Sequence, residues 1–477
     1  MKKNEKNDIK SKIKEVISRC NDNPELYSNI IKDFFTKGID KRGSSLELLK
    51  ILPELKEKDL QKKFKENKKK LCDFIQNPKI EGLEIYNVLS CIFGAFLGDA
   101  IGAFCEFHKC SSNNYKKIFR DSPVFGQLKG QITDDSEMAM CLAYAIMDNP
   151  EKENLNPNYF YFYYGAWSKS NPIDIGNTTK KAFKKFDFIK FNPKKNNFET
   201  IRDEIFASNY NSLSNGFLMR KTTLIAWIYY RFMGEIKNAF KDINDNKKLL
   251  ELYKKLKDIS NIDNQCTHPN EELVCASSFY CIMALGAISG LRSSNIIDKI
   301  YNFCKDEYFN TQKDAEGKVA RNIIFYIDYF KDPKFSFEEN FVNPKGVFFT
   351  NKNIGWYEHS FRLIFYFLIN FEIMKEKDKF KNILHQICNL GGDTDTNACV
   401  VGGVIGPLIG MNNFGDYFEK VLDVIPRDRS LFSICIMALY VQYLKKSNRN
   451  PELIKNNYYF LETILTLIYD DVEIDYT

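Results

Sequence analysis

The chain has 477 residues, of which 44% are hydrophobic and 14% aromatic, so it is long and apolar enough to bury a large core. Its 68 basic and 62 acidic residues leave a net charge of +6, which is too mild an excess to indicate a nucleic-acid-binding protein. The 13 cysteines are odd in number and form no CxxC pair, so a disulfide framework is not expected.

The first 84 residues are polar and rich in lysine. The opening MKKNEKNDIKSK lacks the apolar core of a secretory signal, so a cytoplasmic location is expected, with the nucleus as the alternative. Apolar residues spaced between positions 46 and 55 are typical of short amphipathic helices. We therefore predict a helical N-terminal extension over residues 1–84, of unknown role, and a larger domain over residues 85–477.

The apolar run over residues 88–105 is nearly long enough to cross a membrane. Asp99 lies in its middle, however, and a charged residue at the centre of a membrane span costs about 2.5–3.5 kcal/mol. Small residues around Asp99 would let another helix approach closely. We predict a buried helix that carries Asp99 on or beside its buried face, and no membrane partner.

Another helix is predicted to begin in the stretch GQITDDSEM at 130–138. Thr133, Asp134 and Asp135 stand where side-chain oxygens cap a helix and where the helix dipole favours negative charge. Glu137 completes a capping-box-like spacing. These residues are either an ordinary helix cap or hard oxygen ligands of a cation.

The stretch GGDTDTNA at 391–398 poses the same choice. Asp393, Asp395 and Thr396 bring three oxygen side chains together, and clustered carboxylates repel each other unless a cation lies between them. Oxygen donors favour Mg²⁺, Mn²⁺ or Ca²⁺ over zinc. An EF-hand is excluded, because Ala398 and Val404 stand where that calcium loop needs Gly and Glu.

Three further polar turns precede apolar helical runs. They contain Asp174 and Gly176, then Asn215 and Gly216, and then His268. Strand signals are weak throughout, since few segments alternate β-branched and polar residues. The predicted fold class is therefore all-α, with one compact multi-helix domain.

Six motifs occur in an order that resembles the ADP-ribosylglycohydrolase family, which includes dinitrogenase-reductase-activating and ADP-ribosyl-acceptor hydrolases. The resemblance covers roughly residues 88–425. The motifs are GAFLGDAIGAFCEF (94–107), GQITDDSEMAM (130–140), DIGNTT (174–179), NGFLMR (215–220), CTHPN (266–270) and GGDTDTNA (391–398).

The resemblance implies a centre of two Mg²⁺ or Mn²⁺ ions between two sets of ligands. Thr133, Asp134 and Asp135 would supply one set, and Asp393, Asp395 and Thr396 the other. The reaction it implies is hydrolysis of a glycosidic bond to ADP-ribose, through a transition state with oxocarbenium character.

The resemblance also implies roles for the remaining residues. Glu106 matches the Glu that ends the family's GDxxGxxxE motif and would act as acid/base or gate, with Asp134 or Asp135 as the alternative base. Asp99 would orient a ligand. The groove for ADP-ribose would be formed by Asp174, Gly176, Asn215, Gly216 and His268.

The expected substrate is an ADP-ribosylated protein, modified on arginine or serine, or a small ADP-ribose conjugate. Because both acidic triads and Glu106 are present, we expect an active, monomeric hydrolase. The alternative is a catalytically silent ADP-ribose-binding module whose N-terminal extension recruits partners.

Overall fold

The computed structural model describes residues 3–37, 83–107, 130–149, 154–415 and 430–449. Short gaps fall at 189, 196–197, 243–244 and 376, and scattered residues among 62–74, at 126 and among 460–466 are also described. The amphipathic helices expected near residues 46–55 lie outside these ranges.

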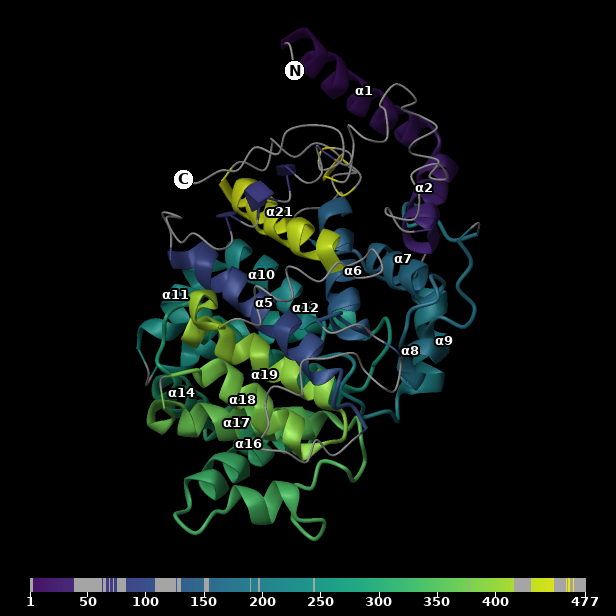
Figure 1. Ribbon diagram of the computed structural model, residues 1–477. Helices are drawn as coiled ribbons and strands as arrows, with labels where there is room; N and C mark the ends of the chain where they lie inside the picture. Colours follow the sequence, from purple (N-terminus) through teal and green to yellow (C-terminus); the bar gives the residue numbers. More distant parts are fainter. Residues whose placement is uncertain are drawn as a thin grey trace.

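Helices account for nearly all regular structure in the described part (Figure 1). In the first half of the chain they are α1 (Lys3–Asp22), α2 (Pro24–Lys37), α5 (Leu83–Gly102), α6 (Asp134–Asp148), α7 (Pro157–Ser168), α8 (Asn177–Ala182), α9 (Phe198–Asn209), α10 (Lys221–Arg231) and α11 (Met233–Lys241). In the second half they are α12 (Asn246–Asn264), α13 (Glu271–Ile288), α14 (Ser293–Cys304), α15 (Glu307–Thr311), α16 (Ala315–Lys331), α17 (Tyr357–Asn370), α18 (Lys379–Leu390), α19 (Thr394–Ile409) and α21 (Ser430–Arg449).

Three short helical turns complete the described part: η2 (Glu338–Val342), η3 (Phe371–Ile373) and η4 (Met411–Asn413). Its only β-type pairing is an isolated antiparallel bridge between Ser214 and Trp356. The all-α prediction is confirmed.

Helices α5 and α19 pack backbone to backbone at the centre of the molecule (Figure 1). A Cβ atom added to Gly94 would lie 2.4 Å from the carbonyl oxygen of Gly402, and one added to Gly98 would lie 2.1 Å from that of Ala398. A Cβ on Gly102 would lie 2.4 Å from the Cα of Asp395. Residue numbers rise along one helix as they fall along the other, so the pair is antiparallel. The C-terminal end of α5 therefore lies against the N-terminus of α19.

Helix α6 is buried along its whole length. It packs against α7 and α10, and the Thr223 hydroxyl of α10 donates to the Ala139 carbonyl at 2.7 Å. Tyr440 of α21 in turn donates to the Thr223 carbonyl at 2.9 Å. This packing leaves the N-terminus of α6 directed at the same region as the N-terminus of α19.

Two helices, over Glu84–Gly102 and Glu271–Ile288, are long and apolar enough to cross a membrane by length and composition alone. In each, 94% of the most apolar window is buried inside the protein. The burial of the first window matches the prediction of a core helix that contains Asp99.

The N-terminal segment is fastened to α6 through one buried carboxylate. Tyr27 of α2 donates to Asp148, the last residue of α6. Tyr163 donates to the same oxygen at 2.6 Å, and the backbone N–H of Phe460 donates to the other carboxylate oxygen at 2.8 Å. Segments near both chain ends thus meet at one end of α6.

Nine cysteines of the described part are free and buried. Cys105 differs from them, because it is disulfide-bonded. The sequence predicts no disulfide framework, and a single bonded cysteine, directly before Glu106, does not make one.

Candidate active site

A cavity of about 460 Å³ opens where the polar turns of the sequence meet. Ten of the predicted site residues line it: Glu106, Asp134, Asp174, Gly176, Asn215, Gly216, His268, Asp393, Asp395 and Thr396. The three others, Asp99, Thr133 and Asp135, are buried directly behind that wall and are at most 1% exposed. The structure thus brings all of the predicted site residues into one region.

Asp99 holds the turn that begins α6. Its carboxylate accepts from the backbone N–H of Thr133 at 3.0 Å and from the Thr133 hydroxyl at 2.8 Å. It also accepts from the N–H and the hydroxyl of Ser136. Burial raises the pKa of Asp99 to about 6 in spite of these donors. Because its oxygens are directed at the α6 turn, Asp99 orients Asp134 and Asp135 from beneath instead of lining the cavity.

The N-terminus of α19 is held by contacts to α5 and to the 215 turn. Gly391 and Gly392 have positive φ values of 72° and 77°, which only glycine adopts without strain. The Thr394 hydroxyl donates to the Gly102 carbonyl at 2.7 Å. The Asn215 side chain donates to the Asp393 carboxylate at 2.8 Å. These contacts place Asp393 and Asp395 at the floor of the cavity.

The two acidic turns are in direct contact. The Thr396 hydroxyl donates to the Asp135 carboxylate at 3.3 Å. Oxygen atoms of Asp99, Asp135 and Asp395 lie within 4.8 Å of one another, and so do oxygens of Glu106, Asp393 and Asp395. The two clusters share Asp395. Each offers the oxygen-only donor set that hard divalent cations prefer.

One buried oxygen in this contact has no partner in the described part of the chain. Asp135 Oδ1 is covered by protein and makes no hydrogen bond, although a buried carboxylate oxygen normally has at least one. A carboxylate oxygen that binds a cation needs no hydrogen-bond donor, so the residues present fit a metal at this position.

The electrostatics of the cavity are strongly acidic. Burial, together with repulsion from neighbouring carboxylates, raises the pKa of Asp134, Asp135 and Asp395 well above the ordinary range. Burial and then Asp393 raise the pKa of Glu106 to about 9. Among the described residues that line the cavity there is no Lys or Arg. The described site concentrates negative charge that a bound cation would neutralise.

The opposite wall of the cavity is rich in hydroxyls and also carries Asp174. His268 Nε2 lies 2.9 Å from the Ser214 hydroxyl. A Cβ on Gly216 would lie 3.1 Å from Cε1 of His268, so the absence of a side chain there lets the ring lie flat against the turn. Asp174 and Gly176 stand at the start of α8, beside Thr178. These residues line one side of the same cavity.

Sequence reasoning missed several residues that line the cavity: Phe107, Met219, Ser214, Ile354 and Gly355. Ser214 precedes the NGFLMR motif and Phe107 follows Glu106, so both were within reach of the motif boundaries. Ile354 and Gly355 belong to no motif. They reach the site because the Asn215 N–H donates to the Gly355 carbonyl at 2.8 Å, a contact that no local pattern indicates.

The described residues form an all-helical protein with a carboxylate-lined cavity. The chain belongs to the ADP-ribosylglycohydrolase family, whose family model matches residues 84–436. It is an enzyme of that family and hydrolyses linkages to ADP-ribose.

Among its relatives is L543 of Acanthamoeba polyphaga mimivirus, whose name assigns it provisionally to the ADP-ribosyl glycohydrolases. It is 27% identical over 336 residues, which cover 67% of this chain and 86% of the viral protein. The ADP-ribosyl-dinitrogen reductase glycohydrolase of Rhodospirillum rubrum is 32% identical over 102 residues, 20% of this chain and 34% of its own. A solved structure described as an ADP-ribosylglycohydrolase-related protein complex is 16% identical and covers 76% of this chain and 99% of its own, with a TM-score of 0.49.

Proposed function

We propose that this enzyme cleaves the glycosidic bond between ADP-ribose and an acceptor with the aid of two divalent cations, Mg²⁺ or Mn²⁺. The acceptor is a protein arginine or serine side chain or a small molecule. One observation carries the proposal: two clusters of carboxylates share Asp395, and no Lys or Arg is among the described residues that line the adjoining cavity. Carboxylates at this spacing repel each other when ionised, and a cation between them removes that repulsion.

The donors for the cations come from both acidic turns. Thr133, Asp134 and Asp135 would contribute from the α6 side, and Asp393, Asp395 and Thr396 from the α19 side. When bound, the cations would neutralise this charge and lower the pKa of nearby water, making it a better nucleophile. Asp99 keeps the first turn in place through its contacts to Thr133 and Ser136.

The proton that the leaving acceptor needs is assigned to Glu106. This side chain lines the cavity, is only 3% exposed and lies within 4.8 Å of Asp393 and Asp395. It is therefore close to the charge centre and shielded from bulk water, as a group that passes a proton to a leaving oxygen or nitrogen must be. Asp134 also lines the cavity but belongs to neither of the two carboxylate clusters that share Asp395, and it is the alternative base.

The part of the cavity beside the two carboxylate clusters has groups that suit the ribose hydroxyls and the diphosphate of ADP-ribose. Thr178, Ser214 and Asn215 supply neutral hydrogen-bonding groups along its wall. Neutral donors bind ribose hydroxyls and diphosphate oxygens without pairing to the neighbouring carboxylates, whereas a lysine placed there would pair with them.

The test is release of ADP-ribose from arginine-linked, serine-linked and small-molecule conjugates, each with Mg²⁺, with Mn²⁺ and with EDTA. We expect metal-dependent release from at least one linkage. Asp134→Ala and Asp395→Ala are each expected to abolish turnover with an unchanged helical circular dichroism spectrum. If either variant kept near-full activity, the shared centre would be refuted.

The same experiment separates the enzyme from the binding module. A protein that binds ADP-ribose but releases none from any linkage, with or without metal, would be the silent module. Comparing Glu106→Gln with Asp134→Asn assigns the proton transfer, because the variant that loses release while still binding both ADP-ribose and Mg²⁺ identifies the group.

A further inference from the structure

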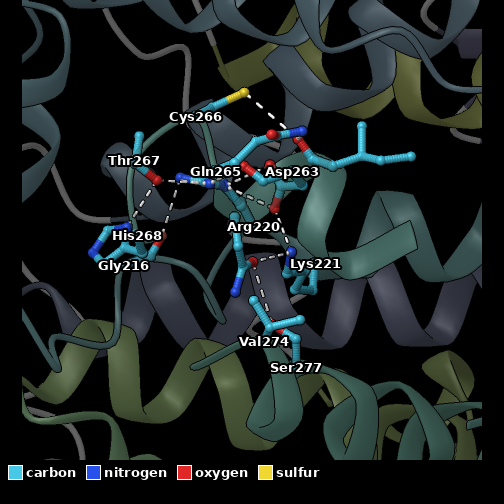
Figure 2. A network of polar contacts seen from close by, with 12 residues as sticks. Gly216, Arg220, Lys221, Asp263, Gln265, Cys266, Thr267, His268, Val274 and Ser277 are labelled. Atoms are coloured by element: carbon cyan, nitrogen blue, oxygen red, sulfur yellow. Dashed lines mark hydrogen bonds and ion pairs between the residues drawn. The ribbon is translucent and has the colours of Figure 1, made fainter. Parts of the chain in front are cut away.

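A buried ion cluster lies behind Gly216 and His268, two residues that line the cavity. Figure 2 shows the cluster with these two residues. Arg220 and Lys221 both pair with the Asp263 carboxylate, and all three side chains are fully buried. Burial alone would raise the pKa of Asp263, but the two cations outweigh it and lower that pKa to about 2. Asp263 therefore stays ionised and fixes the Arg220 guanidinium, whose Nε donates to both carboxylate oxygens at 3.1 and 3.2 Å.

The same guanidinium also contacts Thr267. Arg220 Nη2 donates to the Thr267 hydroxyl oxygen at 2.8 Å, and a guanidinium can only donate. The other contact of this hydroxyl is His268 Nδ1, also at 2.8 Å, and Thr267 is fully buried. Figure 2 shows the three side chains in sequence, with Thr267 between Arg220 and His268.

These contacts select one tautomer of His268. If Thr267 donates to Nδ1, its oxygen accepts from Arg220 and its hydrogen has an acceptor, so both of its hydrogen bonds are made. If Nδ1 carried the hydrogen instead, the Thr267 oxygen would accept twice and its own buried hydrogen would have no acceptor, at the desolvation cost of an unpaired donor. The ring is also held neutral, because burial and then Arg220 lower the pKa of His268 well below its ordinary value. The charged groups that face it are Arg220, Asp263 and Lys221. Its single hydrogen is therefore on Nε2.

The selected tautomer has a consequence on the cavity side. Nε2–H donates to the Ser214 oxygen, so the Ser214 hydrogen does not point back at the ring. It is free for a ligand in the cavity or for one of two neighbouring hydroxyls, those of Thr178 and Ser212, each 3.2 Å from the Ser214 oxygen. Ser214 and Thr178 both line the cavity.

We propose that Asp263, Arg220 and Thr267 are positioning residues that hold His268 as the Nε2–H tautomer and so leave the Ser214 hydroxyl free to donate its hydrogen to an oxygen-rich anionic ligand. His268 is then a fixed neutral donor and exchanges no proton during turnover. The tautomer itself is independent of the reaction, whereas its benefit to ADP-ribose rests on the proposed function.

Two measurements test the proposal separately. The first is the tautomer of His268, read from ¹⁵N NMR spectra of histidine-labelled protein, in which protonated and unprotonated ring nitrogens resonate apart. His268→Gln identifies its signals among the four histidines. We expect protonated Nε2 and unprotonated Nδ1 with no titration between pH 6 and 8. We expect Thr267→Val to lose that preference and Thr267→Ser to keep it. A protonated Nδ1 in the unmodified protein, or an unchanged tautomer in Thr267→Val, would overturn the inference.

The second measurement is binding of ADP-ribose by calorimetry, together with KM and kcat for the linkage that is cleaved. Thr267→Val is expected to weaken binding and raise KM by about two- to tenfold, the range for one lost hydrogen bond, with a smaller effect on kcat. Thr267→Ser should restore both. Ser214→Ala should weaken binding to the same degree with the His268 tautomer unchanged. Equal binding by Thr267→Val and unmodified protein would overturn the link between tautomer and ligand.

A matched control is available next to the ion cluster. Thr222 is also a fully buried threonine, and its hydroxyl has no hydrogen-bond partner in the described part. Thr222→Val should change neither the tautomer nor KM. If the unmodified protein neither binds nor releases ADP-ribose, the proposed function fails, and the NMR result still decides the tautomer by itself.

Discussion

The contact between α5 and α19 predicts a severe effect of adding a single methyl group. In Gly98→Ala the new Cβ would lie 2.1 Å from the Ala398 carbonyl oxygen and 2.7 Å from the Cys399 nitrogen. Ordinary contact begins at 3.4 Å, so the helices must separate by about 1.3 Å, the difference between 3.4 and 2.1 Å. Overpacking of this kind costs about 1–3 kcal/mol or more, and the helix preference of Ala over Gly returns about 1 kcal/mol. We expect a net loss near 2 kcal/mol.

The same displacement acts on the acidic site. Asp99 follows Gly98 directly, and Asp395 stands one turn before Ala398 on the facing helix, so the shift pulls the two acidic turns apart. Metal sites tolerate changes of about 0.2 Å in ligand distance. Gly98→Ala should therefore also lose any rise in melting temperature on addition of Mg²⁺. Urea unfolding followed by circular dichroism measures the first effect, and thermal shift with Mg²⁺ or EDTA measures the second.

The control for this prediction is Gly234→Ala. Gly234 lies in α11, and a Cβ there would meet nothing within 4 Å. The change should be neutral or stabilise the protein by up to about 1 kcal/mol. If Gly98→Ala unfolded at the same urea concentration as the unmodified protein and kept its response to Mg²⁺, the reasoning about the helix contact would be refuted.

Other expected outcomes concern the carboxylates. Mg²⁺ at 100 times its Kd should stabilise the protein by about 2.7 kcal/mol, and a melting temperature equal in Mg²⁺ and EDTA would contradict a metal site. Asp135→Asn removes one like charge from the buried cluster, so it should raise the melting temperature in EDTA and abolish the Mg²⁺ response. Tyr27→Phe deletes a donor to a buried carboxylate, and urea unfolding should show a loss of about 1.5–3 kcal/mol. The pKa of Asp263 is held near 2, below its ordinary 3.8, so its contribution to stability should be complete above about pH 4 and decline as the pH falls toward 2. Asp263→Asn should lack this acid-dependent loss and, because two buried cations lose their partner, be less stable at pH 7 by about 3–5 kcal/mol.

Features that depend on a short stretch of sequence, such as a helix start or a buried helix face, could be predicted. The acids of both helix starts were found because carboxylates at a helix N-terminus form a short motif. Asp99 was placed on a buried face because helical periodicity put it there. That the two acidic turns belong to one centre was implied by the family resemblance, and the charge of each turn was consistent with it.

Contacts that depend on tertiary packing were not predictable in this way. Arg220 closes the NGFLMR motif and was noted only as part of it, while Asp263 lies before the CTHPN motif, and neither pattern indicates that the two side chains pair. Gly355 reaches the site through a backbone hydrogen bond, which leaves no trace in side-chain chemistry. The missing information is the arrangement of helices that are remote in the chain.

The anchoring of Asp148 has a practical consequence for anyone who would shorten the protein. The family match begins at residue 84 and ends at 436, so trimming to those limits deletes both Tyr27 and Phe460 and strips two donors from a carboxylate that remains buried. Asp148 ends the helix that Asp134 begins, about 21 Å away at a rise of 1.5 Å for each step along the helix. Truncation would therefore destabilise the C-terminal end of α6, the helix whose N-terminus carries Asp134 and Asp135. A minimal catalytic fragment should retain both flanking segments.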